Sequence, residues 1–520
     1  MLYSCLNAGL FAVIAATATM TGTAGLPPVP GEIIYQQNFD KPGELAGWLN
    51  ASSEMLSPTE GINGSGCLKL DYAAPQRQLI SMSLDLKPLR GRAIVLEAMM
   101  KGRNISAPSQ KYFGIKLMFN MKTGITEDWQ DHPDKRIGSF DWERFSNFIR
   151  IPTNAEKLNV VIGLQDCSGT LLVDDLKITM IPQVGGSLPV KAAAAGNQVQ
   201  MKTRYRGVTI DGRRTEKDFE DLKKWGVNLV RYHIYGRVPE IEKLPLNDAE
   251  KYRRWLDLKL QELGRTLEYC RKNDLKVIIA LFNALGSTQT SLLSNTLTFT
   301  PEAQDMLVWE WEKMAAKYKD NPTVYGYDIL NEPLENNYSG QSGVLDWDRL
   351  AERVAKAIRK IDPVKPIIIE PSGYGASVYF LVDVPNVIYS VHFYSPQHYT
   401  HQGLNGMPAG LSYPGQIDNI LWNKDTMRKA LAPAIEFKKK YNVPMIVGEF
   451  SALRWAPGSQ QYLKNAIEIF EENGWDWIYH GYREFHGWDA EWSADRKIEG
   501  RLPSTPRKEM LLEYFKRNQQ

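Results

Sequence analysis

The chain has 520 residues, of which 43% are hydrophobic and 23% are charged, as in ordinary globular proteins. Its 62 Lys and Arg nearly balance its 60 Asp and Glu, which leaves a net charge of +2. A nucleic-acid-binding protein carries a basic stripe or patch, whereas the basic side chains here are interspersed with acidic ones, so we expect no nucleic-acid partner. A chain of this length exceeds one typical core, and we expect two domains.

Residues 1–31 have the pattern of a secretory signal peptide. The run at 10–20 is apolar and rich in alanine, and small residues precede Pro27. No Lys or Arg stands before this run, so the α-amino group alone supplies the positive charge. An uncleaved membrane anchor is the alternative, but the run is shorter than the roughly 20 residues of a spanning helix. We therefore expect a signal peptide and a secreted or periplasmic protein without a membrane span.

Residues 32–180 contain short apolar runs separated by turn signals, a pattern typical of an all-β sandwich. The eight expected strands are residues 32–39, 67–72, 78–86, 93–100, 113–121, 145–151, 159–164 and 170–180. The last run, Gly-Thr-Leu-Leu-Val-Asp-Asp-Leu-Lys-Ile, resembles the final strand of jelly-roll carbohydrate-binding modules. We expect a jelly roll that either binds sugar or acts as a spacer. Trp129, Trp142 and Tyr72 are the candidates for stacking on sugar, although protein cores use such residues equally well.

The four cysteines do not suggest a disulfide framework or a zinc site. Cys67 and Cys167 lie in the sandwich region, and the sequence leaves open whether they pair. Cys270 falls in a helical pattern and should be buried. We expect no catalytic metal and no other cofactor, since no cluster of His and carboxylate residues stands at ligand spacing, and the sequence leaves open whether structural calcium is bound.

Residues 181–203 are rich in Pro, Gly and Ala and are expected to be a linker. Beyond them, strand-like and helix-like segments alternate, which is typical of a parallel sheet with helical crossovers. The eight expected strands are residues 205–210, 227–235, 275–282, 324–331, 366–371, 387–394, 443–450 and 475–482. Most are continuous apolar runs, as strands buried on both faces should be. We expect a (β/α)₈ TIM barrel over residues 204–520.

Two of these strands end in a carboxylate. The fourth ends in Asn331-Glu332-Pro333, and the seventh in Gly448-Glu449-Phe450. Active sites of such barrels lie at the carboxyl ends of the strands. Because the fourth and seventh strands face each other across the barrel mouth, Glu332 and Glu449 could act together on one glycosidic bond.

These two motifs resemble glycoside hydrolase family 5 and its clan, and the resemblance extends from about Tyr205 to the C-terminus. It implies that Glu332 is the general acid/base, that Glu449 is the nucleophile, and that the reaction retains the anomeric configuration. It further implies that Asn331 hydrogen-bonds the substrate 2-hydroxyl. Arg231, near the end of the second strand, matches the family's Arg that keeps the nucleophile ionised.

The resemblance also assigns roles near the sixth and eighth strands. His392 and Tyr394 share one side of the sixth strand and match a family pair, with His392 near the sugar or the acid/base and Tyr394 bonded to the nucleophile. Of the Trp residues that could form the floor of the sugar subsite, Trp488 is our choice and Trp455 the second candidate. Asn283 departs from the family, because many members carry a His near the end of the third strand.

We therefore expect a monomeric retaining glycoside hydrolase that cleaves a β-linked polysaccharide or oligosaccharide, most similar to an endo-β-1,4-glucanase. An exo-acting β-glycosidase and a β-mannanase of the same clan are the alternatives. A non-catalytic carbohydrate-binding protein is a hypothesis of a different class, which the presence of both carboxylates argues against.

Overall fold

The structure is a computed structural model of the whole chain. It describes residues 31–109, 113–132, 136–152, 154–180, 203–235, 248–282, 284–285, 287–288, 295–297, 301–334, 345–373, 375, 380–404 and 407–519. Nearly all of the expected signal peptide, nearly all of the expected linker and Asn283 lie outside the described residues.

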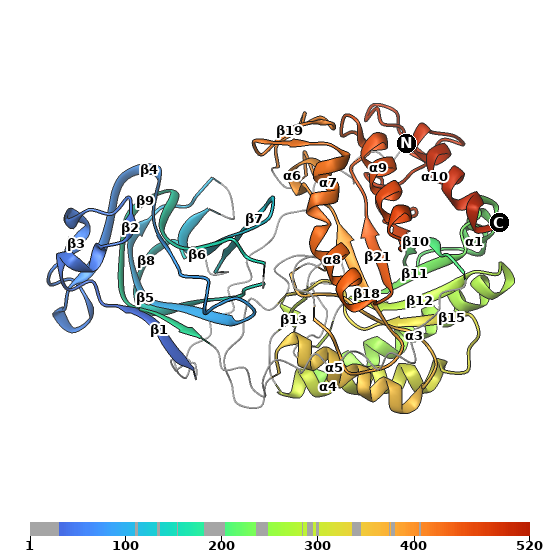
Figure 1. Cartoon of the computed structure of the whole chain (residues 1–520), viewed down its shortest axis with the longest axis horizontal. Helices are drawn as coiled ribbons and strands as arrows, with labels where there is room; N and C mark the ends of the chain where they lie inside the picture. Colours follow the sequence, from blue (N-terminus) through green and yellow to red (C-terminus); the bar gives the residue numbers. More distant parts are fainter. Residues whose placement is uncertain are drawn as a thin grey trace, which may run out of the picture.

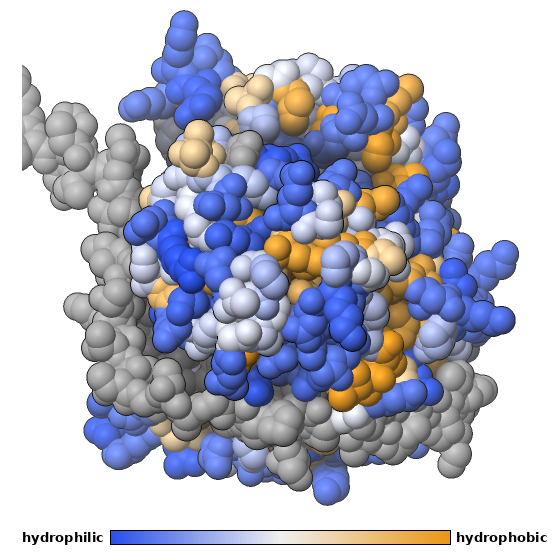
Figure 2. Space-filling view, turned by 90° about the vertical axis from the view of Figure 1, so that its left-hand side faces the viewer, coloured by the Kyte–Doolittle hydropathy of each residue, from blue (hydrophilic) through white to orange (hydrophobic). Residues whose placement is uncertain are grey.

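The N-terminal part is built almost entirely of strands (Figure 1, blue to teal). Its strands are β1 (Glu32–Gln37), β2 (Trp48–Leu49), β3 (Leu56–Ser57), β4 (Cys67–Ser83), β5 (Ala93–Ile105), β6 (Gly114–Thr123), β7 (Thr126–Asp131), β8 (Gly138–Arg150) and β9 (Lys157–Met180), with three short 3₁₀ helices η1 (Pro42–Leu45), η2 (Ser53–Met55) and η3 (Ile62–Gly64). Hydrophilic side chains predominate on the face that is turned away from the barrel, and they surround smaller apolar patches (Figure 2).

Two long strands connect the layers of this sandwich. β4 and β9 run antiparallel over most of their length, and the first half of β9 pairs with β6 while its second half pairs with β5 and β1. Apolar side chains from both halves, such as Leu70 and Ile80 of β4, belong to one core. Four strands that the sequence predicted therefore form only two. The turn signals near Pro75 and Asp166 mark irregularities at which the strands bend without ending.

Cys67 and Cys167 are both buried, and no disulfide joins them. Cys167 lies opposite Gln76, whereas Leu68, the neighbour of Cys67, lies opposite Val173. The two thiols are thus separated by several residues along the strands, which exceeds the reach of a disulfide. Cys270 is buried in a helix, as predicted.

The C-terminal part is a closed barrel of eight parallel strands (Figure 1, green to red), which confirms the predicted TIM barrel. In order around the barrel, they are β10 (Arg206–Ile210), β11 (Leu229–Ile234), β12 (Lys276–Leu281), β15 (Val324–Asp328), β17 (Ile367–Ile369), β18 (Val387–Phe393), β21 (Met445–Phe450) and β22 (Asp476–Tyr479). Each lies within one of the eight segments that the sequence predicted.

Helices and short strands complete the described part of the barrel. The helices are α1 (Glu216–Trp225), α3 (Ala249–Lys272), α4 (Pro301–Tyr318), α5 (Trp347–Ile361), α6 (Gln397–Thr400), α7 (Lys424–Ala430), α8 (Ala432–Tyr441), α9 (Ser459–Glu472), α10 (Pro506–Phe515) and the 3₁₀ helix η4 (Lys516–Gln519). The short strands are β13 (Ser287–Thr288), β14 (Asn295–Leu297), β16 (Pro333–Leu334), β19 (Gly415–Ile417) and β20 (Ile420–Trp422). No described helix combines the length and the apolar composition needed to cross a bilayer.

Helix α1 illustrates how the local sequence sets these elements. Thr215 and Asp218 form a capping box at its start, and Gly226 ends it in the left-handed conformation that glycine adopts without strain. Between them, Phe219 and Leu222 are fully buried in the layer between the strands and the helices. Capping and apolar spacing thus place the helix against the outside of the barrel.

The interior of the barrel is filled by a separate apolar cluster, to which six strands contribute one aliphatic side chain each: Leu229, Ile278, Ile368, Ile388, Ile446 and Ile478. This packing closes the barrel below the polar residues at its mouth.

The two parts of the chain touch through a few side chains. Arg150, at the end of β8, donates from Nη2 to Asp346 Oδ2 at 3.1 Å, and Asp346 directly precedes α5. Ile125, between β6 and β7, packs against the core of the barrel.

Candidate active site

Glu332 and Glu449 meet at the barrel mouth. Glu332 lies between β15 and β16 with φ of 45°, and Glu449 is the penultimate residue of β21. Both are buried, with 9% and 4% of their surfaces exposed. A carboxylate oxygen of one lies within 4.8 Å of a carboxylate oxygen of the other. The predicted convergence of the two strand ends is therefore present.

The surroundings of Glu332 favour its protonated form. Burial raises the pKa of this carboxyl to about 7, although the hydrogen bond and the charge of His392 act in the opposite direction. Nδ1 of His392 lies 2.9 Å from Glu332 Oε1. A carboxyl group with such a pKa can donate a proton near neutral pH.

The surroundings of Glu449 favour its ionised form. Burial alone would raise its pKa, but the charges of His480, His392 and Arg231 outweigh this effect and hold the pKa well below its ordinary range. Nη1 of Arg231 donates to Oε1 at 2.6 Å, and the Tyr394 hydroxyl donates to Oε2 at 3.0 Å. The same environment thus drives the two carboxyl groups to opposite protonation states.

Arg231 is the centre of this network and is fully buried. Besides Glu449, its guanidinium donates to Asp328 Oδ2 at 2.7 Å, to Glu370 Oε1 at 2.8 Å and to Asn331 Oδ1 at 2.9 Å. Of the site residues predicted on the fourth and seventh strands, Asn331 and Glu449 are therefore held by one cation, whereas Glu332 is held by His392.

His392, in β18, and Tyr394, which directly follows this strand, both face Glu449, as the alternation predicted. The backbone of Gly448 runs directly against His392, because a Cβ at this glycine would come within 2.8 Å of His392 Nε2. A residue larger than glycine at position 448 would therefore collide with the His392 ring.

The sequence of residues 192–484 matches the family model described as cellulase, glycosyl hydrolase family 5, over more than half of the chain. The chain belongs to glycosyl hydrolase family 5. It is accordingly an O-glycosyl hydrolase of the cellulase family, and it acts on polysaccharide.

Curated relatives agree with this family. Endoglucanase C of Acetivibrio thermocellus is 25% identical over 303 residues, which cover 51% of this chain and 83% of that protein. Cellodextrinase A of Ruminococcus flavefaciens is 24% identical over 287 residues, covering 52% and 79%. Among solved structures, Thermotoga maritima Cel5A in complex with cellobiose has 22% identity and a TM-score of 0.45, covering 60% of this chain and 98% of that one.

Two Trp residues of this family 5 hydrolase were predicted near the sugar. Trp488 packs beside Tyr394 and His480, with ring centroids 6.1 and 4.8 Å away, and only 7% of it is exposed. Trp455 lies further along the chain after β21, where its indole donates to the Gln402 carbonyl at 3.1 Å. Trp488 is thus the one whose ring contacts a residue bonded to Glu449.

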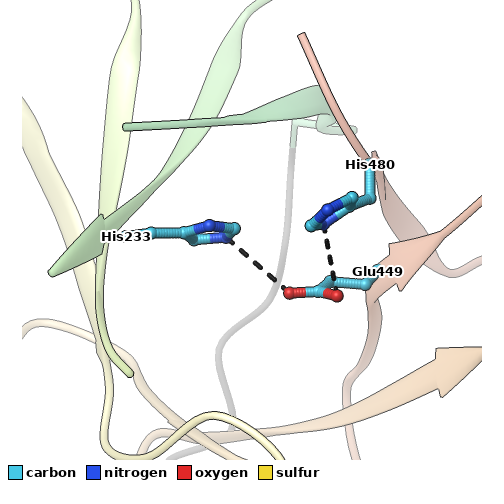
Figure 3. Close-up of side chains that lie close together, drawn as sticks. All are labelled: His233, Glu449 and His480. Atoms are coloured by element: carbon cyan, nitrogen blue, oxygen red, sulfur yellow. Dashed lines mark ion pairs between the residues drawn. The ribbon is translucent and has the colours of Figure 1, made fainter. Parts of the chain in front are cut away.

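Three residues that no sequence motif indicated belong to this site. His480, which directly follows β22, places Nδ1 3.2 Å from Glu449 Oε2, and His233 of β11 places Nε2 3.7 Å from Oε1 (Figure 3). Glu370 directly follows β17 and is fully buried. Glu332 and Glu449 were predicted because they are polar residues at strand ends. The same criterion also applies to His480 and Glu370.

Two overlapping groups of side chains have spacings that a metal ion could accept within the described residues: His233, Glu449 and His480, and Glu332, His392 and Glu449. Both depend on Glu449, which already accepts a short hydrogen bond from Arg231. An added cation would meet this fixed positive charge, so the arrangement suits acid/base chemistry better than metal binding.

Proposed function

We propose that this chain is a retaining hydrolase of β-linked polysaccharide, most similar to an endo-β-1,4-glucanase, with Glu332 as acid/base and Glu449 as nucleophile. The observation that carries the proposal is the pair of carboxylates within 4.8 Å of each other, one favoured as acid and one as anion. Retaining glycosidases have carboxyl groups about 5–5.5 Å apart, whereas inverting enzymes separate them by about 6.5–9.5 Å to admit a water.

The reaction then proceeds in two displacements. Glu449 attacks the anomeric carbon while Glu332 transfers its proton to the leaving glycosidic oxygen, which gives a covalent glycosyl-enzyme. In the second step, Glu332 takes a proton from a water molecule whose oxygen attacks the anomeric carbon and releases Glu449. Each step forms one bond to the anomeric carbon and breaks another.

The remaining side chains hold this geometry. Arg231, Tyr394 and His480 stabilise the charge of Glu449 until it attacks. Asn331 contacts the substrate 2-hydroxyl, as the family resemblance implies, and its hydrogen bond from Arg231 fixes its orientation. Trp488 lies along the sugar subsite beside Tyr394.

Chemical rescue tests the two roles separately. In Glu449→Gly, azide can enter the space of the lost carboxylate and attack from that face, so we expect a glycosyl azide of inverted configuration. In Glu332→Ala, azide can replace the second-step water, so we expect a product of retained configuration. The opposite pairing would reverse the roles, and an inverted product from the native enzyme would overturn the mechanism.

A β-1,4-glucan is the substrate that we propose, and the names of the relatives Endoglucanase C and Cellodextrinase A support it. Hydrolysis of defined β-1,4-linked glucose and mannose oligosaccharides, with products resolved by chain length, would test it. Preference for mannose oligosaccharides would favour the β-mannanase alternative. Steady monosaccharide release with little loss of viscosity would favour an exo-acting enzyme.

We also propose a sugar-binding role for the sandwich over residues 32–180, with Trp129 as its contact. This ring on β7 is 51% exposed, whereas Tyr72 is buried in the core. Trp129 lies opposite Asn120, whose amide donates to Glu127 Oε1 at 3.0 Å, so a polar group stands beside the ring. The full chain with Glu449→Gln should bind insoluble cellulose, and Trp129→Ala in that background should weaken binding.

For the rest of the chain, we propose that residues 1–31 are removed on export, that 181–203 link the two domains, and that 204–520 form the catalytic domain. N-terminal sequencing of the protein recovered from its native host would test the first of these proposals. An N-terminus at Met1 would contradict it.

A further inference from the structure

Glu370 is a third carboxylate of the site, and the double displacement assigns it no step. It directly follows β17 and no part of it is exposed. A buried carboxylate is costly unless charges or hydrogen bonds compensate for lost hydration. The partners of Glu370 therefore indicate what it does.

Two hydrogen-bond donors and a ring nitrogen of His392 surround its two oxygens. Oε2 accepts the backbone N–H of Glu332 at 2.7 Å. Oε1 accepts from Arg231 Nη2 at 2.8 Å and lies 3.1 Å from His392 Nε2. An ionised carboxylate is an acceptor only, so this set of donors fits the anion.

His392 lies between two carboxylates. Its Nε2 faces Glu370 and its Nδ1 faces Glu332 Oε1 at 2.9 Å. Both ring nitrogens can donate only when the ring is an imidazolium. Burial alone would lower the pKa of His392, but the charges of Glu370 and Glu449 and the hydrogen bonds raise it well above its ordinary value.

The titratable groups around this ring come from neighbouring strand ends. They are the carboxyl groups of Glu332, Glu370, Glu449 and Asp328 and the basic side chains of Arg231 and His233. Of the carboxylates, Glu370 contributes the largest charge effect on the imidazolium. Its removal should therefore change the protonation of His392 more than any other single substitution outside the catalytic pair.

Glu370 also holds the backbone of Glu332. Glu332 has φ of 45°, a left-handed backbone conformation that residues other than glycine and asparagine rarely adopt. The hydrogen bond from its N–H to Glu370 Oε2 fixes the peptide in this conformation. The direction in which the Glu332 side chain leaves the backbone depends on this contact.

We propose that Glu370 is a positioning residue for the acid/base: it orients and charges His392 on one side, fixes the backbone of Glu332 on the other, and thereby sets when Glu332 can give up its proton. This inference rests on the role proposed for Glu332. Glu370 itself contacts no reacting atom.

A purely structural role would be to neutralise Arg231. Arg231 already has Asp328 and Glu449 as partners at 2.7 and 2.6 Å, however, so it does not depend on Glu370 for a counter-charge. If Glu370 had only a structural role, its substitution would lower stability and nothing else. If it is a positioning residue, its substitution also changes the protonation of His392.

The test is Glu370→Gln, which keeps the size of the side chain and removes its charge. With 4-nitrophenyl β-cellobioside as substrate, we expect kcat to fall at least about tenfold with KM within about twofold, and the pH dependence of kcat to change. Glu471→Gln is the matched control, because Glu471 pairs with Arg206 of β10 at 2.7 Å, at the opposite end of the strands. It should lower stability and leave the pH dependence as in the native enzyme.

A second measurement does not require turnover, and its first part uses the native protein. In the native protein labelled with ¹⁵N-histidine, the ring of His392, assigned by its loss in His392→Gln, should remain doubly protonated from pH 5 to 8. In Glu370→Gln its titration midpoint should move to lower pH. A neutral His392 in the native protein, or an unchanged midpoint and unchanged pH dependence in Glu370→Gln, would overturn the proposal. Failure of Glu332 as acid/base would appear instead in the azide experiment and would leave the histidine titration as expected.

Discussion

The hydroxyl of Tyr394 donates to Glu449 Oε2 at 3.0 Å, while the opposite oxygen of Glu449 is bound by Arg231. Tyr394→Phe removes this donor and little else. A hydrogen bond to a charged group contributes about 1.5–3 kcal/mol, so kcat/KM should fall roughly 10- to 100-fold. Tyr462→Phe is the control, since that buried hydroxyl donates to the Ser395 carbonyl instead. Equal losses in the two variants would argue against a specific role for Tyr394.

Loss of the acid has a larger expected effect. General acid–base catalysis contributes about 10²–10⁴-fold, so Glu332→Gln should lower kcat by this order on an unactivated β-glucan. The loss should be much smaller for a substrate whose leaving group needs no protonation, such as a dinitrophenyl glycoside. A steady-state comparison of the two substrates measures this difference, and equal losses on both would exclude Glu332 as the acid.

The pH dependence follows from the two carboxyl groups. Glu332 must be protonated and has a pKa of about 7, so activity should decrease as the pH rises through about 7. Glu449 must be ionised and has a pKa well below its ordinary value, so activity should persist at pH values below the ordinary pKa of a glutamate. The profile of kcat/KM against pH reports both groups in the free enzyme. An acid limb near pH 6 would contradict the role given to Glu449.

His480 should control the acid limb. Its charge is the first of those that lower the pKa of Glu449, so His480→Gln should raise that pKa. More of Glu449 is then protonated at low pH, and the acid limb of the profile should move to higher pH. His398→Gln, at an exposed His paired with Asp418, should leave the limb in place.

A buried acid far from the chemistry should affect stability. Glu310 of α4 is fully buried, and burial raises its pKa well above the ordinary value, with the Tyr252 hydroxyl as its partner at 2.8 Å. Because the folded-state pKa lies above that of the unfolded chain, the contribution of Glu310 to stability should be greatest below about pH 4.5 and should decrease as the pH rises.

Glu310→Gln removes this dependence. At pH 7 it should raise the free energy of unfolding by at least about 1 kcal/mol, the equivalent of one pKa unit. Urea unfolding of the native protein and the variant at pH 4 and pH 7 measures the effect. Glu312→Gln, at an exposed position of the same helix, should change stability little at either pH.

The barrel was predictable because its strands are buried on both faces and therefore read as apolar runs. Strand-end position then separated Glu332, Glu449 and Arg231 from the many other charged residues. Prediction was less accurate in the sandwich, where β4 and β9 continue through turn-like residues. A β-bulge and a true turn use the same residue types, and only the pairing partner decides between them.

The sequence by itself determined the barrel, its family and the two carboxylates, because apolar periodicity and strand-end motifs are local properties of the chain. Only the tertiary structure decided which residues surround those carboxylates. Glu370 and His480 follow short, ordinary strands, and their significance depends on facing His392 and Glu449 across the barrel mouth. The pKa values likewise depend on burial and on charges brought together from separate strands, which no local pattern contains.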